Sequence, residues 1–188
     1  MAFLASLWLP IVVSAIGVFV ASFITHTVLP YHRNDVLKLS SDKENVVLDA
    51  LRRIDVAPGD YAAPHAGGAA GMKDPAFIAK ATKGPLAFVT IAPGAAPSMG
   101  PYLALWFVYC VVVSACSAYI VWRVVGPAAS FNMVFRFAGA VAFMAYAMAL
   151  PQHSIWYRRN WGTTLKSMFD GVIYGLITGA VFAWLWPK

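Results

Sequence analysis

The fold is decided by the first apolar stretch of the chain, FLASLWLPIVVSAIGVFVASFITHTVL, residues 3–29. It contains no Asp, Glu, Lys or Arg, and it exceeds the roughly 20 residues with which a helix crosses about 30 Å of hydrocarbon. No Lys or Arg precedes it and no small-residue cleavage site follows it. We therefore expect a retained transmembrane helix and not a signal peptide.

The composition of the whole chain agrees with a lipid environment. Of 188 residues, 60% are hydrophobic and only 12% are charged, whereas ordinary globular chains carry about 25% charged residues. A chain of this length cannot bury so much apolar surface in one water-facing core. This excludes a soluble globule. The high apolar fraction also excludes disorder, and two cysteines exclude a disulfide scaffold.

Three more apolar stretches follow a long polar connection. We predict spans at about residues 102–122, 130–150 and 167–186, and Pro151 ends the span at 130–150. The predicted fold class is thus an all-α integral membrane protein with four transmembrane helices and a small α/β insert between helices 1 and 2. The predicted domains are helix 1 (1–30), the insert (31–100) and a three-helix transmembrane block (101–188).

Basic residues near the span ends predict the orientation, because loops rich in Lys and Arg stay in the cytoplasm. Seven lie on the side of the insert and the third loop: Arg33, Lys38, Lys43, Lys83, Arg158, Arg159 and Lys166. Only Arg123, Arg136 and Lys188 lie opposite. We predict a multi-pass protein of the bacterial inner membrane, an organellar membrane being the alternative, with both termini outside and residues 31–100 cytoplasmic. The net charge of +6 is explained by interfacial contacts with anionic lipid, so no nucleic-acid partner is predicted.

The insert contains three predicted elements. An S-x-x-E capping pattern begins a helix at about 42–54, Asp74-Pro75 begins another that reaches about Ala81, and residues 86–91 have strand composition. The strand needs a partner, which is the Tyr61 region, a second copy or the membrane surface. The insert lacks the glycine spacings of phosphate-binding loops. No cofactor is predicted.

Glycines recur at every fourth position of the last span, at Gly171, Gly175 and Gly179. Such a glycine zipper lets another helix backbone approach closely. One interpretation is packing within the chain, with partners on the third span at Ala138, Ala142, Ala145 and Ala149. The other is a homo-oligomer seam with a second copy.

Asp170 is the only acidic residue in or near a predicted span. One interpretation is structural: a carboxylate in the first turn of the fourth helix, paired with Lys166 four residues earlier. The other is functional, because an ionisable group at membrane depth is costly to bury. In that case Asp170, Tyr174 and Thr178 would follow one helix face along an ion or proton pathway.

Three histidines, His26, His32 and His153, are predicted to lie at the same membrane face as Asp170. Imidazole and carboxylate groups can hold Zn²⁺ or another divalent ion if three or four converge. No local spacing such as H-E-x-x-H supports this. Hydrogen-bonded interfacial histidines are therefore the first interpretation, and a metal site is the second.

Aromatic and basic residues gather in the third loop, at Trp156, Arg158, Arg159, Trp161 and Lys166. Aromatic rings settle at headgroup depth and guanidinium groups meet phosphate. This pattern predicts a lipid-headgroup contact, either a general anchor or a pocket for an anionic ligand.

No nucleophile motif such as G-x-S-x-G is present, so an enzyme is the less favoured class and no catalytic residue is assigned. The first functional hypothesis is a self-associating protein that forms a small channel or transporter-like assembly in the lipid bilayer. The alternatives are an accessory or scaffold subunit that holds a membrane protein partner through the insert, and a lipid-binding or lipid-modifying protein.

Overall fold

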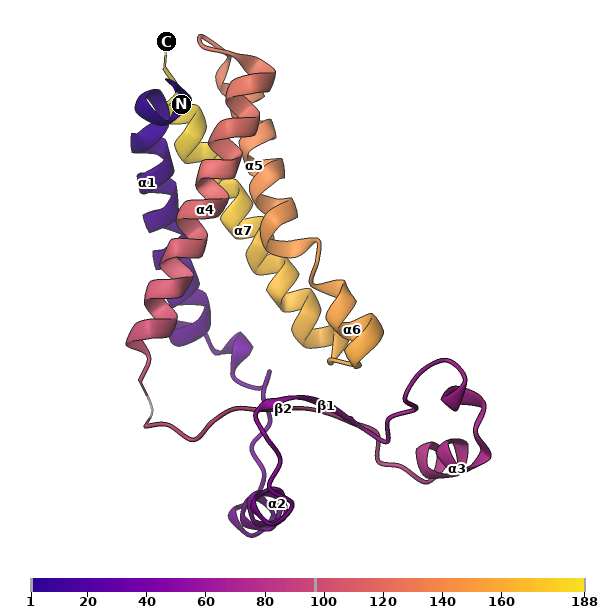
Figure 1. Ribbon diagram of the computed structural model, residues 1–188. Coiled ribbons are helices and arrows are strands. Elements are labelled where there is room, and N and C mark those ends of the chain that lie inside the picture. Colours follow the sequence, from indigo (N-terminus) through magenta and orange to yellow (C-terminus); the bar gives the residue numbers. More distant parts are fainter. Residues whose placement is uncertain (1, 97, 188) are drawn as a thin grey trace. The chain divides into compact units, whose positions relative to one another are not determined.

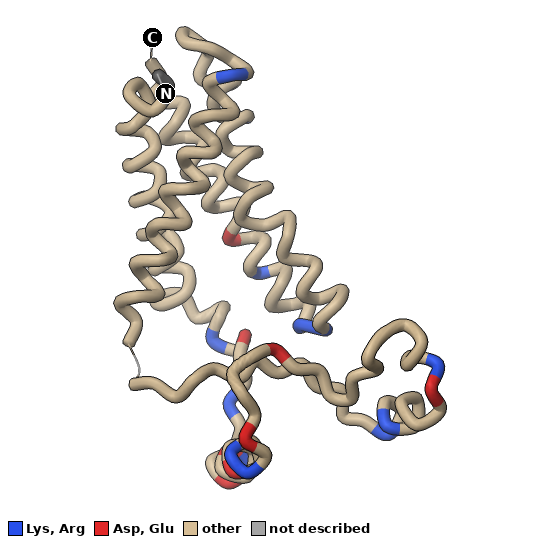
Figure 2. The backbone as a smooth tube through the Cα atoms, viewed as in Figure 1, with Lys and Arg blue, Asp and Glu red and all other residues tan. Residues whose placement is uncertain are grey.

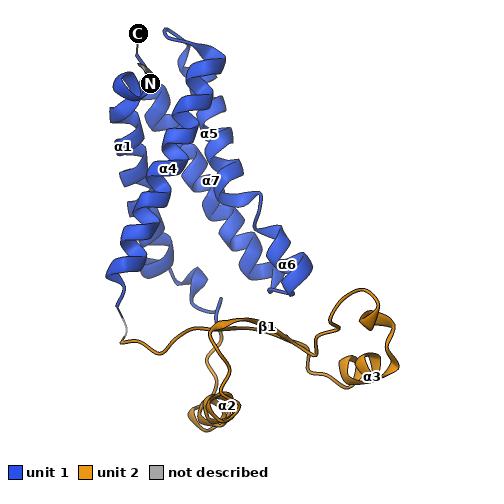
Figure 3. Cartoon of the chain, in the orientation of Figure 1, with its two compact units in different colours: residues 1–36, 98–188 blue, residues 37–97 orange. Residues whose placement is uncertain are grey.

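The computed structural model describes residues 2–96 and 98–187. The chain divides into two compact units (Figure 3), one formed by residues 1–36 with 98–188 and the other by residues 37–97. Charged residues are sparse along the long helices of the first unit and frequent in the second (Figure 2). Each unit is described by itself.

Four helices of the first unit are long and apolar enough to cross a membrane, which suggests a multi-pass membrane protein. This confirms the four predicted spans in their coarse form. The helices are shown in Figure 1: α1 (Ala2–Phe23) with the π-helical turn η1 (Ile24–Val28), α4 (Gly100–Val125), α5 (Phe131–Ala147) followed by α6 (Pro151–Tyr157), and α7 (Trp161–Trp184).

Both chain ends lie at one end of this bundle, and the segments that lead to residues 37–97 leave from the other end (Figure 1). The turn between α4 and α5 is tied to the C-terminal segment. The indole Nε1 of Trp186 donates to the carbonyl of Gly126 at 3.1 Å, and the amide of Ala128 donates to the carbonyl of Pro187 at 3.3 Å. A buried apolar cluster at this end includes Leu7, Val121, Val134 and Phe182.

Two predicted helix boundaries were wrong. Helix α7 begins at Trp161 and not near Ser167, because the side chain of Asn160 caps it by accepting from the Gly162 amide at 2.7 Å. Asp170 therefore lies in the third turn of α7 and not in the first. Helix α5 ends at Ala147 and not at Leu150. Pro151 begins α6, since the first turn of a helix tolerates its missing N–H.

The glycines of α7 pack against α5 of the same chain. A Cβ atom on Gly171 would lie 2.7 Å from the Cβ of Ala147, and one on Gly175 would lie 2.8 Å from the carbonyl oxygen of Gly139. A Cβ on Gly179 would lie 2.7 Å from the carbonyl oxygen of Phe135. Because α5 already fills this stripe, the stripe does not support self-association.

The α5 face in this contact is not the predicted one. Its members are Phe135, Gly139, Phe143 and Ala147, instead of Ala138, Ala142, Ala145 and Ala149. The reason is Gly139, which removes a side chain at the closest approach and lets the two backbones meet.

The second unit contains the helices α2 (Ser41–Arg53) and α3 (Pro75–Lys83), with the 3-10 turn η3 (Gly71–Lys73) before α3. The strands β1 (Gly59–Ala63) and β2 (Ala87–Ile91) pair antiparallel, with Tyr61 opposite Val89. Both predicted helices and the strand are confirmed, and the Tyr61 region is the partner of that strand. The predicted S-x-x-E cap is wrong, because Ser41 is already the first residue of α2 and Ser40 at the N-cap makes no side-chain hydrogen bond. No described residue of this unit is buried. It therefore lacks a core of its own in residues 37–96.

Replacing Gly175 by Val should destabilise the bundle, because the new side chain would overlap the backbone of α5. Overpacking of this kind costs about 1–3 kcal/mol. We expect a lower melting temperature for the purified protein in detergent. Ala180→Val adds two carbon atoms, against three in Gly175→Val, on the exposed face of α7 and should leave the melting temperature nearly unchanged. Equal melting temperatures for the two variants would contradict the α5–α7 contact.

Candidate functional site

The site is built around Asp170, whose side chain is only 2% exposed. It is the only Asp or Glu within the four long helices. An ionised carboxylate removed from water must be compensated by hydrogen bonds or opposite charge. The hydrogen-bond and ion-pair partners of Asp170 are therefore the groups that stabilise this part of the bundle.

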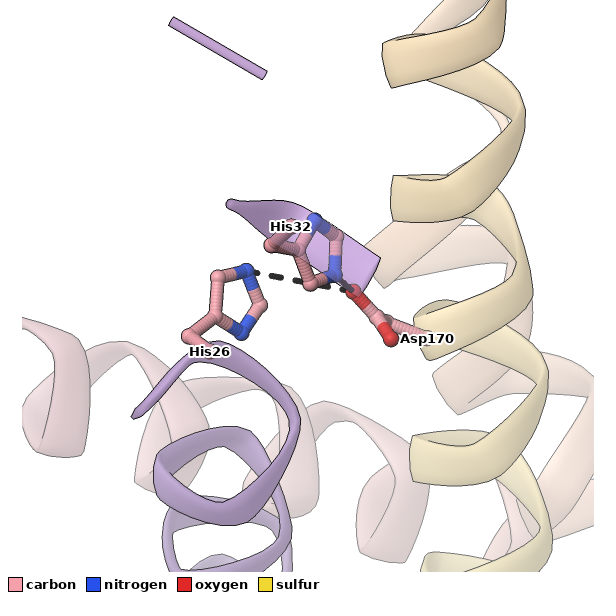
Figure 4. A group of neighbouring side chains, drawn as sticks. All are labelled: His26, His32 and Asp170. Atoms are coloured by element: carbon pink, nitrogen blue, oxygen red, sulfur yellow. Dashed lines mark hydrogen bonds and ion pairs between the residues drawn. The ribbon is translucent and has the colours of Figure 1, made fainter. Parts of the chain in front are cut away.

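The partners come from the end of the first span. After α1 the helix continues as the wider π-helical turn η1. The backbone is extended at Leu29 and then forms the 3-10 turn η2 (Pro30–His32). This path stacks the imidazole rings of His26 and His32, with centroids 4.1 Å apart and planes inclined by 8°. Both rings lie beside the carboxyl group of Asp170 (Figure 4).

One oxygen of Asp170 faces both imidazoles. Its Oδ2 lies 2.7 Å from Nε2 of His32 and 3.8 Å from Nε2 of His26. The other oxygen, Oδ1, accepts a hydrogen bond from the hydroxyl of Tyr31. Burial, and then this hydrogen bond to the carboxylate, raise the pKa of Tyr31 far above its ordinary value. The hydroxyl therefore remains protonated and able to donate.

Asp35 contacts the other ring nitrogen of His32, and Lys166 contacts Asp35. The Nδ1 of His32 lies 2.6 Å from Oδ2 of Asp35, and Nζ of Lys166 donates to Oδ1 of Asp35 at 2.8 Å and to the carbonyl of Tyr31 at 2.6 Å. Burial acts to raise the pKa of Asp35, but the bonds with His32 and Lys166 outweigh it and lower the pKa. Asp35 is thus an ionised partner for His32.

The predicted pairing of Lys166 with Asp170 is wrong, because Lys166 reaches Asp35 and the Tyr31 carbonyl instead. Lys166 thus acts on His32 through Asp35. The other predicted lipid-contact residues lie around the α6–α7 turn. Trp156 and Trp161 are exposed, and Arg158 ends α6 in a left-handed conformation. Their contact with lipid, including that of Arg159, stays a prediction.

A cavity of about 520 Å³ lies beside Asp170 between α1, α4, α5 and α7. Its aromatic lining consists of Phe19, Phe23, Trp106, Tyr109, Tyr146 and Tyr174. His26 and Asp170 also line it, and none of its described lining residues is Lys or Arg. The indole of Trp106 donates to Oγ of Ser22 at 2.8 Å, which fixes one wall to α1. The cavity thus combines aromatic faces with a single acidic group.

Two of the three predicted pathway residues line the cavity. Asp170 and Tyr174 line the cavity, and the Tyr174 hydroxyl lies 3.5 Å from Oγ1 of Thr25. Thr178 is fully buried and is not part of the lining. The cavity therefore extends along α7 no further than the turn of Tyr174.

Of the three histidines predicted to lie at one membrane face, the structure brings His26 and His32 together but not His153. His153 lies in α6, and its ring is 6.0 Å from that of Tyr157. Sequence reasoning missed Tyr31 and Asp35. The available signal was the i, i+3 spacing of His32 and Asp35 directly after the first span.

No family model matches this chain, and neither the curated proteins nor the solved structures include a match to it.

Tyr31→Phe should destabilise the protein, because it leaves a buried oxygen of Asp170 without its donor. The loss of one such bond to a charged group costs about 1–3 kcal/mol. Chemical unfolding in detergent measures the change. Tyr102→Phe is the control, since Tyr102 is 69% exposed and should change little. Similar stabilities of both variants would argue against the Tyr31–Asp170 bond.

Proposed function

We propose that this chain is a multi-pass membrane protein of the transporter or channel class, which takes a small cation into the cavity beside Asp170. The observation that carries the proposal is a buried carboxylate in the wall of an aromatic-lined cavity between four apolar helices. Acidic residues at membrane depth are expensive and mark ion pathways. Aromatic faces add to the attraction, because their electron density favours cations.

The packing around the cavity favours a carrier over an open pore. At the end of the bundle that holds the chain termini, the helices close around Leu7, Ile11, Val121, Val134 and Phe182, all buried. The cavity residues lie toward the opposite end, at the end of α1 and the start of α4. A cation would therefore enter from one side, and its passage would require the helices to move. Self-association is not needed for the binding step and remains a separate prediction.

The orientation proposed from the basic residues places the cavity mouth at the cytoplasmic face of a bacterial inner membrane. The same proposal places residues 31–100 in the cytoplasm and both termini outside. It is supported by Arg158, Arg159 and Lys166, which lie toward the end of the bundle opposite to the termini.

Uptake by proteoliposomes tests the proposed function. Vesicles containing the purified chain should accumulate at least one of Na⁺, K⁺, Mn²⁺ and Zn²⁺ faster than empty vesicles, as measured by elemental analysis after removal of external ions. Asp170→Asn should lower this uptake roughly tenfold or more, as the loss of about 1.4 kcal/mol of cation binding would. Glu44→Gln, an exposed position of α2, should leave it unchanged. The proposal fails if no cation enters faster, or if Asp170→Asn transports normally.

Cysteine labelling of intact cells tests the orientation. In a protein with Cys110 and Cys116 replaced by Ala, Ser130→Cys places a thiol at the α4–α5 turn and Ala69→Cys places one in the insert. A membrane-impermeant maleimide should label position 130 in intact cells, and position 69 only after lysis. The reverse pattern would show that the insert faces outward.

A further inference from the structure

We propose that Nε2 of His26, Nε2 of His32 and Oδ2 of Asp170 form a three-ligand site for a divalent transition-metal ion, with Zn²⁺ as the best fit. The inference deepens the proposed function and rests on it, because it names the class of cation that the cavity takes. The two imidazoles come from the segment after α1 and the carboxylate from α7, so the site joins the first and last spans (Figure 4).

The three ligand atoms are already near coordination geometry. All lie within 4.8 Å of one another. Oδ2 of Asp170 is 2.7 Å from Nε2 of His32 and 3.8 Å from Nε2 of His26. Around a tetrahedral Zn²⁺ with bonds of about 2.0–2.1 Å, neighbouring ligand atoms are about 3.3 Å apart. The two distances lie on either side of this value.

Each imidazole is oriented through the nitrogen that would not bind the metal. Nδ1 of His32 lies 2.6 Å from Asp35, and Nδ1 of His26 lies 3.1 Å from the carbonyl oxygen of Ser22. An acceptor at Nδ1 places the proton there and leaves the lone pair of Nε2 for a metal ion. A carboxylate or carbonyl is the usual hydrogen-bond acceptor for the other nitrogen of a metal-bound histidine.

The carboxylate is held in the same way. Tyr31 donates to Oδ1 of Asp170 and leaves Oδ2 toward the imidazoles. Lys166 in turn fixes Asp35, which orients His32. Each of the three ligand groups is therefore held by a group that is not itself a ligand: the Ser22 carbonyl for His26, Asp35 for His32 and Tyr31 for Asp170.

Both ring nitrogens of His32 face a carboxylate oxygen. A neutral imidazole has a single N–H, yet both nitrogens of His32 lie within 2.7 Å of a carboxylate oxygen. A metal ion bound to both Nε2 and Oδ2 would account for the close approach of these two atoms. The metal ion explains in addition why Nε2 of His26 faces the same oxygen.

The ligand set selects the class of ion. Two imidazole nitrogens and one carboxylate oxygen suit Zn²⁺ and its first-row neighbours, whereas Ca²⁺ and Mg²⁺ prefer oxygen ligands throughout. His26 and Asp170 also line the cavity, so the fourth position of a tetrahedral ion would face it. Three protein ligands with one open position leave room for water or for ligand exchange during release.

Metal binding by the full-length protein tests the inference. Protein purified without a histidine tag and dialysed against a chelator should bind one Zn²⁺ per chain by equilibrium dialysis. Co²⁺ in its place should give the visible absorption of a tetrahedral ion with nitrogen and oxygen ligands. His32→Ala and Asp170→Asn should abolish the absorption band. His153→Ala is the matched control and should retain it, because His153 lies outside the group.

Two further variants keep the test decisive if Asp170→Asn fails to fold. His26→Gln alters a half-exposed side chain and should still lose the tetrahedral band. Asp35→Asn should keep one ion per chain but bind it roughly 10- to 100-fold more weakly, as loss of a second-shell partner does. Binding of no ion, or equal binding by His26→Gln, His32→Ala and His153→Ala, would overturn the proposed site.

The binding experiment and the uptake experiment test the site and the carrier function independently of each other. One bound Zn²⁺ per chain with no uptake of any cation by vesicles would uphold the site but overturn the carrier function. Uptake of Na⁺ or K⁺ that depends on Asp170, without metal binding, would overturn the site and leave the carrier function standing.

Discussion

The structure of the bundle depends on the burial of one carboxylate. Asp170 lies 2% exposed among apolar helices, where removing the partners of a buried charge costs about 3–5 kcal/mol. Contacts from the segment that follows the first span offset this cost. The π-helical turn, the extended Leu29 and the 3-10 turn bring Tyr31 and His32 onto Asp170. The first and last spans are thereby joined by polar contacts as well as by packing.

The cavity follows from the contrast between two sides of α7. On one side, Gly175 meets Gly139 and the backbones of α5 and α7 approach closely. On the other, the rings of Trp106, Tyr146 and Tyr174 meet with centroids 5.3 to 6.2 Å apart. Small residues bring α5 and α7 together on one side, and large aromatic side chains line the cavity next to Asp170 on the other.

The elements that could be predicted from sequence are those with local signals. The four spans, the helices α2 and α3, and the strand β2 each follow from composition, capping or periodicity within about twenty residues. The start of α7 was missed because its cap, Asn160, stands between aromatic and basic residues that resemble an interfacial loop. The site itself was not predictable in detail, since His32 and Asp170 are 138 positions apart and no spacing rule links them. The i, i+4 rule assigned Lys166 to Asp170, but Asp35 is the partner that the fold provides.

The most direct test of this account is a double-mutant cycle between His32 and Asp170, with unfolding free energies measured in detergent for His32→Asn, Asp170→Asn and the double variant. Contact between the two side chains predicts an interaction energy of about 0.5–3 kcal/mol, so that the second substitution costs much less than the first. Strictly additive effects would contradict the account, because they would mean that the segment after the first span does not hold the buried carboxylate.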